Sequence, residues 1–177
     1  MADRRRDAEF TDFVRARGAS LLQTATYLCP DAHQAQDLVQ VTLTKTYLAW
    51  PSARRPEPYA YARRILVNSN IDRWRRRRWR EHPDGDVASH SSAPVVEDAT
   101  GQVVDRGLLL AALTGLTTRE RTVLVLRFYE DLSERDTAGL LQVNVGTIKS
   151  TTSRALAKLR LHPDLQPVNQ EPSHADH

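Results

Sequence analysis

The sequence predicts an all-α protein made of two small helical domains joined by a flexible acidic linker. Apolar residues recur at spacings of three, four and seven along most of the 177-residue chain, which is the periodicity of amphipathic helices, and no segment is convincing as a strand. The periodicity breaks over residues 81–104, where turn-forming residues take its place. A chain of this length can form one domain or two, and the break favours two.

The first domain is expected over residues 7–80, with three or four helices. Its apolar periodicity predicts helices over residues 10–28, 31–50 and 59–74, the last being one helix or two joined end to end. Asp31 is a suitable N-cap for the second helix, which Pro51 is expected to end. Residues 52–58, rich in proline and arginine, form the connection to the third.

The linker and the second domain follow. Residues 81–104 carry five carboxylates and no lysine or arginine, which predicts an acidic tether. Helical periodicity resumes in the second domain, expected over 105–162, where Thr117 with Glu120 fits a capping box and Ser133 can cap another helix. A final helix is expected over 145–161. The polar tail at 163–177 is predicted to be disordered.

Residues 132–150 predict a helix-turn-helix. Ala138 is a small residue where the two helices face each other, and Asn144 is a suitable N-cap for the recognition helix. That helix presents polar and basic side chains suited to phosphates and base edges in a major groove, namely Thr147, Lys149, Ser150, Ser153, Arg154 and Lys158. The alternative is a plain helical hairpin with a solvated basic face, which the caps, the small residue and the basic face together disfavour.

Residues 71–80 interleave basic and aromatic side chains. The segment contains Trp74, Trp79 and a run of arginines at 75–78. Arginines hold phosphates by releasing counterions, and aromatic rings stack on bases, so the pattern suits a nucleic-acid surface. The tryptophans can equally be core residues. The arginine run favours DNA, because so many like charges repel one another unless a polyanion compensates them.

The composition argues against several other classes of protein. Cys29 is the only cysteine, which excludes an internal disulfide, and the six histidines lack metal-ligand spacing. No segment approaches the ~20 apolar residues of a membrane span. The chain shows no Gly-rich phosphate loop and no nucleophile with an evident base. We therefore expect a cytoplasmic protein that is not an enzyme, needs no metal or cofactor and does not contact a membrane.

Taken in order, these segments resemble the extracytoplasmic-function sigma factors, and particularly the actinobacterial group called the SigE family. The resemblance covers most of residues 9–161. The motifs that carry it lie at residues 13–22, 37–40, 61–72, 124–133 and 146–156. It implies a sigma-2-like domain and a sigma-4-like helix-turn-helix domain, which together give RNA polymerase its promoter specificity.

The resemblance also assigns roles to residues of the first domain. A helix that includes residues 37–40, ordinary on its composition alone, would bind the clamp helices of the polymerase β′ subunit through Asp37, Leu38, Gln40 and Val41. The later segment would melt and read the −10 region, with Asn68 contacting an extruded base. The residues implied in −10 binding are Tyr61, Arg64, Asn68, Asp72, Arg73, Arg75, Arg76 and Arg77. The second domain would read the −35 element.

The sequence departs from the family pattern at a few positions. Val41 stands where glutamate is usual, and Tyr61 replaces a common tryptophan. Gln142 replaces a turn glycine, and a positive φ there would cost about 1 kcal/mol. Thr151 and Thr152 replace a longer basic residue and an apolar one, so a phosphate contact and some packing are expected to be missing.

The resemblance implies two main partners, which are promoter DNA and core RNA polymerase, the latter bound through its β′ clamp helices and β flap. Family habit adds an anti-sigma factor, for which no residue of the chain gives evidence. The acidic linker would run toward the RNA exit path, or serve only as a tether. Two other classes stay open. A repressor or activator that binds duplex DNA as a symmetric dimer explains residues 133–160 but leaves Asn68 and the arginine run without a role. An adaptor would bind polymerase without reading DNA.

Overall fold

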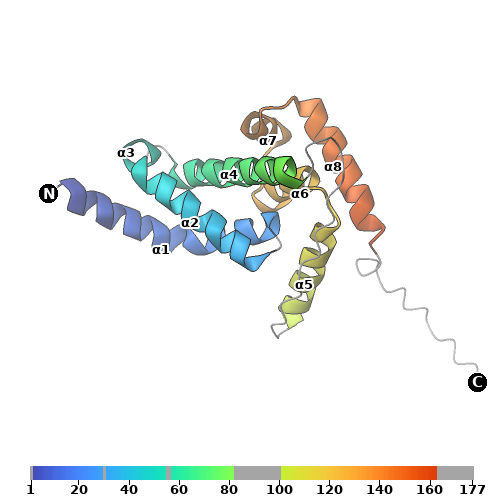
Figure 1. Cartoon of the computed structure of the whole chain (residues 1–177), viewed down its shortest axis with the longest axis horizontal. Helices are drawn as coiled ribbons and strands as arrows, with labels where there is room; N and C mark the ends of the chain where they lie inside the picture. The colour runs from blue at the N-terminus through green and yellow to red at the C-terminus, as the bar shows by residue number, and fades with distance from the viewer. Residues whose placement is uncertain (1, 30, 55–56, 82–100, 163–177) are drawn as a thin grey trace, which may run out of the picture.

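The computed structural model describes residues 2–29, 31–54, 57–81 and 101–162, and these ranges are helical with short connections and no strand. The elements are α1 (Ala2–Leu28), α2 (Ala32–Leu48), α3 (Trp50–Ala53), α4 (Pro58–Glu81), α5 (Gly101–Thr114), α6 (Thr118–Leu124), the π-helical turn η1 (Val125–Tyr129), α7 (Glu134–Leu141) and α8 (Val145–Arg160). The N-terminus and α3 lie at one end of the molecule, and α8 lies at the other (Figure 1). The predicted all-α class is confirmed.

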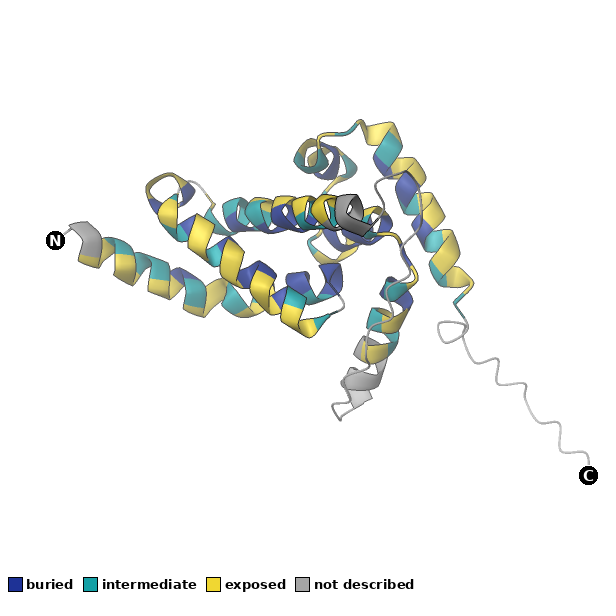
Figure 2. Ribbon diagram, viewed as in Figure 1, coloured by how far each residue is buried: buried dark blue, intermediate teal, exposed yellow. Residues whose placement is uncertain are grey.

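The first group of helices, α1 to α4, is built around α2, which packs against both α1 and α4. Leu21, Leu66 and Val67 are completely buried where these helices meet. Figure 2 shows the pattern that results, with buried residues between the helices and exposed residues along the outer side of α2. Amphipathic periodicity therefore predicted which sides of these helices form the core.

The boundaries in this group differ from those predicted. The first helix starts at Ala2, eight residues before Phe10, because polar residues continue the helix past its apolar stripe. The second ends at Leu48, and Pro51 lies in the first turn of the short helix α3, where its fixed φ and missing N–H are tolerated. The third is one continuous helix, α4.

The second group, α5 to α8, begins earlier than predicted. Helix α5 starts at Gly101, so the last four residues of the predicted linker at 81–104 are helical. Thr117 and Glu120 form the predicted capping box, and Ser133 and Asn144 cap α7 and α8 as predicted. Residues 82–100 and the tail at 163–177 lie outside the described residues, so the predictions made for them stay predictions.

The helix that the capping box starts, α6, widens after Leu124 into the π-helical turn η1. There the N–H of Glu130 donates to the carbonyl of Val125 at 2.9 Å, a bond that spans five residues instead of four. Such widened turns are rare and often accompany functional positions. Here the turn places Glu130 against α1 and α4 of the first group.

The two groups share one buried cluster in this structure. It joins Leu28 and Leu66 of the first group to Leu116 and Leu126 of the second. Arg121 of α6 is also buried, and it donates to the carbonyl of Leu28 at the end of α1 at 3.2 Å. The same guanidinium donates to carbonyls that close the end of α5, those of Leu113, Thr114 and Leu116. Arg121 thus ties the second group to the first.

Candidate nucleic-acid interface

The helix-turn-helix consists of α7, the turn at residues 142–144, and α8. Ala138 and Ile148 are buried between the two helices, in a cluster that also contains Val123 of α6. The Asn144 Oδ1 atom accepts hydrogen bonds from the Thr147 N–H at 2.8 Å and from its hydroxyl at 2.7 Å. These contacts start α8 at a defined residue and orient its outer face.

The outer face of α8 carries most of the residues predicted to contact the −35 element. Lys149, Ser150, Ser153 and Arg154 are exposed, and Thr147 is half-buried. Lys149 lies 3.9 Å from the Glu134 carboxylate of α7, a contact that is weak because both groups face solvent. These side chains are therefore available to a DNA groove.

Lys158 has a different environment. Its Nζ atom lies 2.9 Å from the Oε2 atom of Glu120, the buried carboxylate of the capping box. Burial raises the pKa of Glu120, but the hydrogen bonds from Lys158 and Thr117 outweigh it, and the pKa lies below its usual value. Lys158 thus holds α8 to the start of α6, and its predicted contact with DNA would compete with its ion pair with Glu120.

Gln142 ends α7 in the left-handed region, with φ 55° and ψ 45°. Its N–H donates to the carbonyl of Gly139. Position 142 thus has a positive φ although the turn glycine usual in the family is missing, and the turn forms despite the side chain. At the other departures in this domain, Thr151 is buried and Thr152 is half-buried. Position 151 therefore faces the core and is not placed for a phosphate contact.

Helix α4 brings five of the eight predicted −10 residues onto one stripe. Residues 61, 64, 68, 72 and 75 follow one another at intervals of three or four, so they share a helix face. Arg64, Asn68, Asp72, Arg75 and Arg76 are exposed, whereas Tyr61 packs partly against the core. Trp74 is half-buried. The side chains of Arg77 and Trp79 lie outside those that the structure describes.

Arg73 lies off this stripe. Its guanidinium donates to the backbone carbonyl of Gln34 at 2.9 Å and to the Asp37 carboxylate of α2 at 3.3 Å. Two predicted contact residues, one for DNA and one for polymerase, therefore pair with each other. Arg73 holds α4 to α2 in this structure, and a phosphate contact would require that pairing to break.

The outer side of α2 presents three of the four residues predicted to bind polymerase. Asp37, Gln40 and Val41 are exposed, but Leu38 is 3% exposed and packs in the core, so we assign it a packing role. Leu48 lies two turns beyond Val41 and is 74% exposed. Leu48 is therefore an apolar side chain of α2 that the core does not cover.

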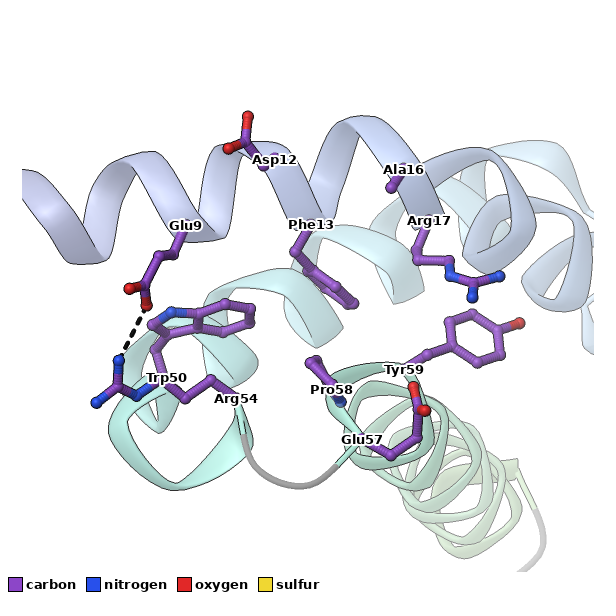
Figure 3. Close-up of a pocket in the computed structure, with 10 residues that line it drawn as sticks. All are labelled: Glu9, Asp12, Phe13, Ala16, Arg17, Trp50, Arg54, Glu57, Pro58 and Tyr59. Carbon is purple, nitrogen blue, oxygen red and sulfur yellow. Dashed lines mark hydrogen bonds and ion pairs between the residues drawn. The ribbon is translucent and has the colours of Figure 1, made fainter.

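A cavity of about 510 Å³ lies between α1, α3 and the start of α4. Figure 3 shows Phe13, Trp50 and Tyr59 along it, with the guanidinium of Arg17 next to the Tyr59 ring. None of the predicted contact residues lines this cavity. The described residues contain no cluster of metal-ligating side chains. No helix among them is long and apolar enough to cross a bilayer.

A cluster that sequence analysis missed joins the two groups of helices at Glu130, whose side chain is 4% exposed. One carboxylate oxygen lies 2.5 Å from the Thr24 hydroxyl and accepts from the Tyr59 hydroxyl at 2.9 Å. The other accepts from the Arg63 Nη1 atom at 3.0 Å. Burial, together with the nearby carboxylate, raises the pKa of Tyr59 to about 12. No spacing rule links residues so far apart in the chain.

The fold and the two exposed faces define a helical DNA-binding protein with a helix-turn-helix in its second half. Two family models match the chain, Sigma-70 region 2 over residues 13–80 and Sigma-70, region 4 over residues 106–159. The chain is 41% identical to the RNA polymerase sigma-E factor of Streptomyces avermitilis over 86% of its length and 83% of that protein. The chain belongs to the sigma-70 family of RNA polymerase sigma factors, in its extracytoplasmic-function group. It is therefore a transcription initiation factor.

More distant relatives are also sigma factors. The chain is 24% identical to the ECF RNA polymerase sigma factor SigW of Bacillus subtilis, over 85% of its length and 87% of that protein. Among solved structures, it is similar to the sigma factor RpoE of Bartonella quintana in complex with the anti-sigma factor NepR. That match has a TM-score of 0.65 and 25% identity, and it covers 86% of this chain and 94% of that one.

Proposed function

We propose that the two groups of helices divide the work of promoter recognition. The first, about residues 7–80, docks on core polymerase and captures the −10 region, and the second, about 105–162, holds the −35 duplex. The observation that carries this proposal is the presence of two separate exposed faces, the polar stripe of α4 and the basic face of α8, on segments that match different regions of the family.

Docking uses the outer side of α2, with Asp37, Gln40 and Val41 on the β′ clamp helices and the second domain on the β flap. Val41 is 44% exposed, so an apolar contact replaces the polar one that glutamate makes in relatives. An anti-sigma factor is a further partner, supported by the Bartonella quintana sigma factor, which was solved in complex with one. The protein works beside polymerase in the cytoplasm.

Melting of the −10 region needs no cofactor and no nucleotide hydrolysis in this proposal, so the protein is not an enzyme. Asn68 is exposed on α4 and offers both a donor and an acceptor, which can read a base edge once the base leaves the stack. Unpairing costs a few kcal/mol per base, and pocket contacts and stacking on the flipped base offset that cost. Arg75 and Arg76 are exposed further along α4, where they can hold phosphates.

The proposal is tested by tethering a DNA-cleaving iron chelate to single cysteines in the complete protein bound to core polymerase. Cys29 is buried, so a new surface cysteine is labelled selectively. The Ser153→Cys conjugate should cut promoter DNA near −35 and the Asp72→Cys conjugate near −10. The chelate on Arg15→Cys, an exposed residue of α1, which carries neither face, should cut neither. Exchange of the two cleavage positions would reverse our assignment. Cleavage at two symmetric half-sites without polymerase would favour a dimeric repressor.

A further inference from the structure

The contacts around Glu130 form a built site for an anion. The Tyr59 hydroxyl and the Arg63 Nη1 atom donate to its carboxylate, and the Thr24 hydroxyl lies within hydrogen-bond distance of both this carboxylate and the Ser20 carbonyl. All the donors belong to α1 and α4 of the first domain, and the anion comes from the second. Arginine, tyrosine and threonine side chains are also the ones that proteins use to hold DNA phosphates.

The site has more positive charge and more donors than Glu130 uses. The guanidinium of Arg17 lies over the Tyr59 ring at 5.4 Å and that of Arg63 at 5.8 Å, so two cations lie at this ring, and of the two Arg63 is the one that pairs with Glu130. Asp12 and Glu57 line the neighbouring cavity, but neither forms an ion pair with Arg17 or Arg63 among the described side chains.

Arg63 itself is only partly used. The carboxylate engages its Nη1 atom, while its Nε atom is buried without a hydrogen-bond partner. The N–H groups of a guanidinium form a planar fork, and that fork suits bidentate contact with a phosphate. Glu130 therefore occupies the site but leaves the Nε–H group of Arg63 without an acceptor.

The two domains must separate before both promoter elements can be bound at once. Helix α6 contacts both α4 and α8, so at 8–10 Å per helix layer α4 and α8 approach to about 20 Å. The two elements are named for positions about 25 base pairs apart, which at about 3.4 Å per base pair is ~85 Å of straight duplex. Separation withdraws Glu130 and leaves the donors of α1 and α4 without their anion.

We propose that Thr24, Tyr59 and Arg63 form a phosphate site that Glu130 occupies while the domains are packed together, and that a backbone phosphate of promoter DNA replaces Glu130 when they separate. The proposal rests on the proposed function, since it requires the first domain to hold DNA. Arg63 lies five residues before Asn68, about 7.5 Å along the helix axis. Five residues also turn the helix by about 140°, so Arg63 and Asn68 lie on different faces of α4, and the phosphate that Arg63 would hold is a neighbouring one along the strand, not that of the base that Asn68 reads. Glu130 acts as an internal competitor of DNA.

The first test measures binding of a fluorescein-labelled 20-nucleotide oligothymidine to the complete free protein between about 50 and 200 mM salt. Glu130→Gln should tighten binding about tenfold at low salt, because the competing charge is gone, and should steepen the slope of log K against log salt by about 0.7, the value for one single-strand phosphate. Asp131→Asn removes the same charge one residue away, from an exposed side chain, and should bind like wild type.

Adding Arg63→Gln to Glu130→Gln should cancel the gain. Adding Arg15→Gln instead, at a side chain that is 78% exposed on α1, should leave it in place. If the double variant with Arg63→Gln still binds the oligonucleotide more tightly than wild type, Glu130 only holds the two domains together, and the phosphate site is refuted. Absence of any gain, or an equal gain in Asp131→Asn, would overturn it as well.

A second test does not depend on the stability of the Glu130 variant. In the complex with core polymerase, where the domains are separated, Arg63→Gln alone should weaken binding of the same oligonucleotide about tenfold and flatten the salt slope by about 0.7. Unchanged binding would refute the site. If the chain failed to bind polymerase at all, the proposed function would fall, and the measurements on free protein would still decide about the phosphate site.

Discussion

Gln142 offers a direct test of the turn that orients the recognition helix. An L-residue in the left-handed region costs roughly 1–2 kcal/mol, and Gln142 has φ 55° and ψ 45°. Glycine removes that cost, but it loses more conformational freedom on folding, which destabilises the folded state by about 0.5–1 kcal/mol. The side chain is exposed, so its removal loses little packing. Gln142→Gly should therefore raise the free energy of unfolding by about 0.5–1 kcal/mol.

The two groups share one buried cluster, so the chain is expected to unfold as one unit of 177 residues, for which a change of 1 kcal/mol shifts the melting temperature by about 2–4 °C. Calorimetry should therefore show Gln142→Gly melting about 1–4 °C above wild type. Gln142→Ala keeps the Cβ atom and should show no gain. Gly139→Ala makes the opposite exchange inside α7, where an added Cβ atom meets nothing within 4 Å, and it should also stabilise by about 0.5–1 kcal/mol. A Gln142→Gly variant that melts no higher than Gln142→Ala would refute the backbone argument.

Further predictions concern DNA contacts and pH. Lys149→Ala and Arg154→Ala should each weaken −35 duplex binding. Loss of a base contact should cost ~1–3 kcal/mol at one base pair, whereas loss of a phosphate contact should weaken binding to all sequences and flatten the slope of a salt titration. If both variants bind and initiate like wild type, our placement of the recognition face is wrong. Lys158→Met should instead lower the free energy of unfolding in a denaturant titration, because it removes the partner of Glu120, and by only about 1 kcal/mol, because Lys158 is half exposed. Unchanged stability together with weaker DNA binding would contradict this. Asn68→Ala should impair promoter melting in a permanganate footprint more than closed-complex binding, and normal melting with unchanged base preference on a pre-melted template would exclude base reading. The pKa of Tyr59, raised to about 12, favours the neutral hydroxyl in the folded state, so its stabilising effect should be present below pH ~10 and be lost as the pH rises toward ~12. Tyr59→Phe should remove that part of the alkaline loss of stability, and identical pH profiles for the two proteins would contradict the assignment.

Much of the architecture could be predicted because it depends on local rules. The caps at Thr117, Ser133 and Asn144 follow from side chains that accept from the backbone three residues on, and each is present. The exposed stripe of α4 and the exposed face of α8 follow from helical periodicity. The resemblance to a family that usually has glycine at position 142 raised the question of a positive φ there, and the structure answers it.

What the sequence did not predict depends on contacts between distant segments. Arg73 and Lys158 have the charge that DNA binding needs, but in the structure each is held by a carboxylate on another helix. Glu130 looks like a loop residue until the π-helical turn places it against α1 and α4, more than 60 residues away in the chain. Residue type and spacing describe one helix at a time, so pairings of this kind appear only once the helices are packed.

Transcription with purified core polymerase tests whether this chain gives RNA polymerase its promoter choice. Core polymerase from a Streptomyces species would transcribe a library of genomic fragments with and without the complete protein, and the 5′ ends of the transcripts would be sequenced. We expect new start sites that share two upstream elements about 25 base pairs apart. Use of these sites should fall when Lys149 or Asn68 is replaced by alanine. Start sites indistinguishable from those of core polymerase alone would contradict it.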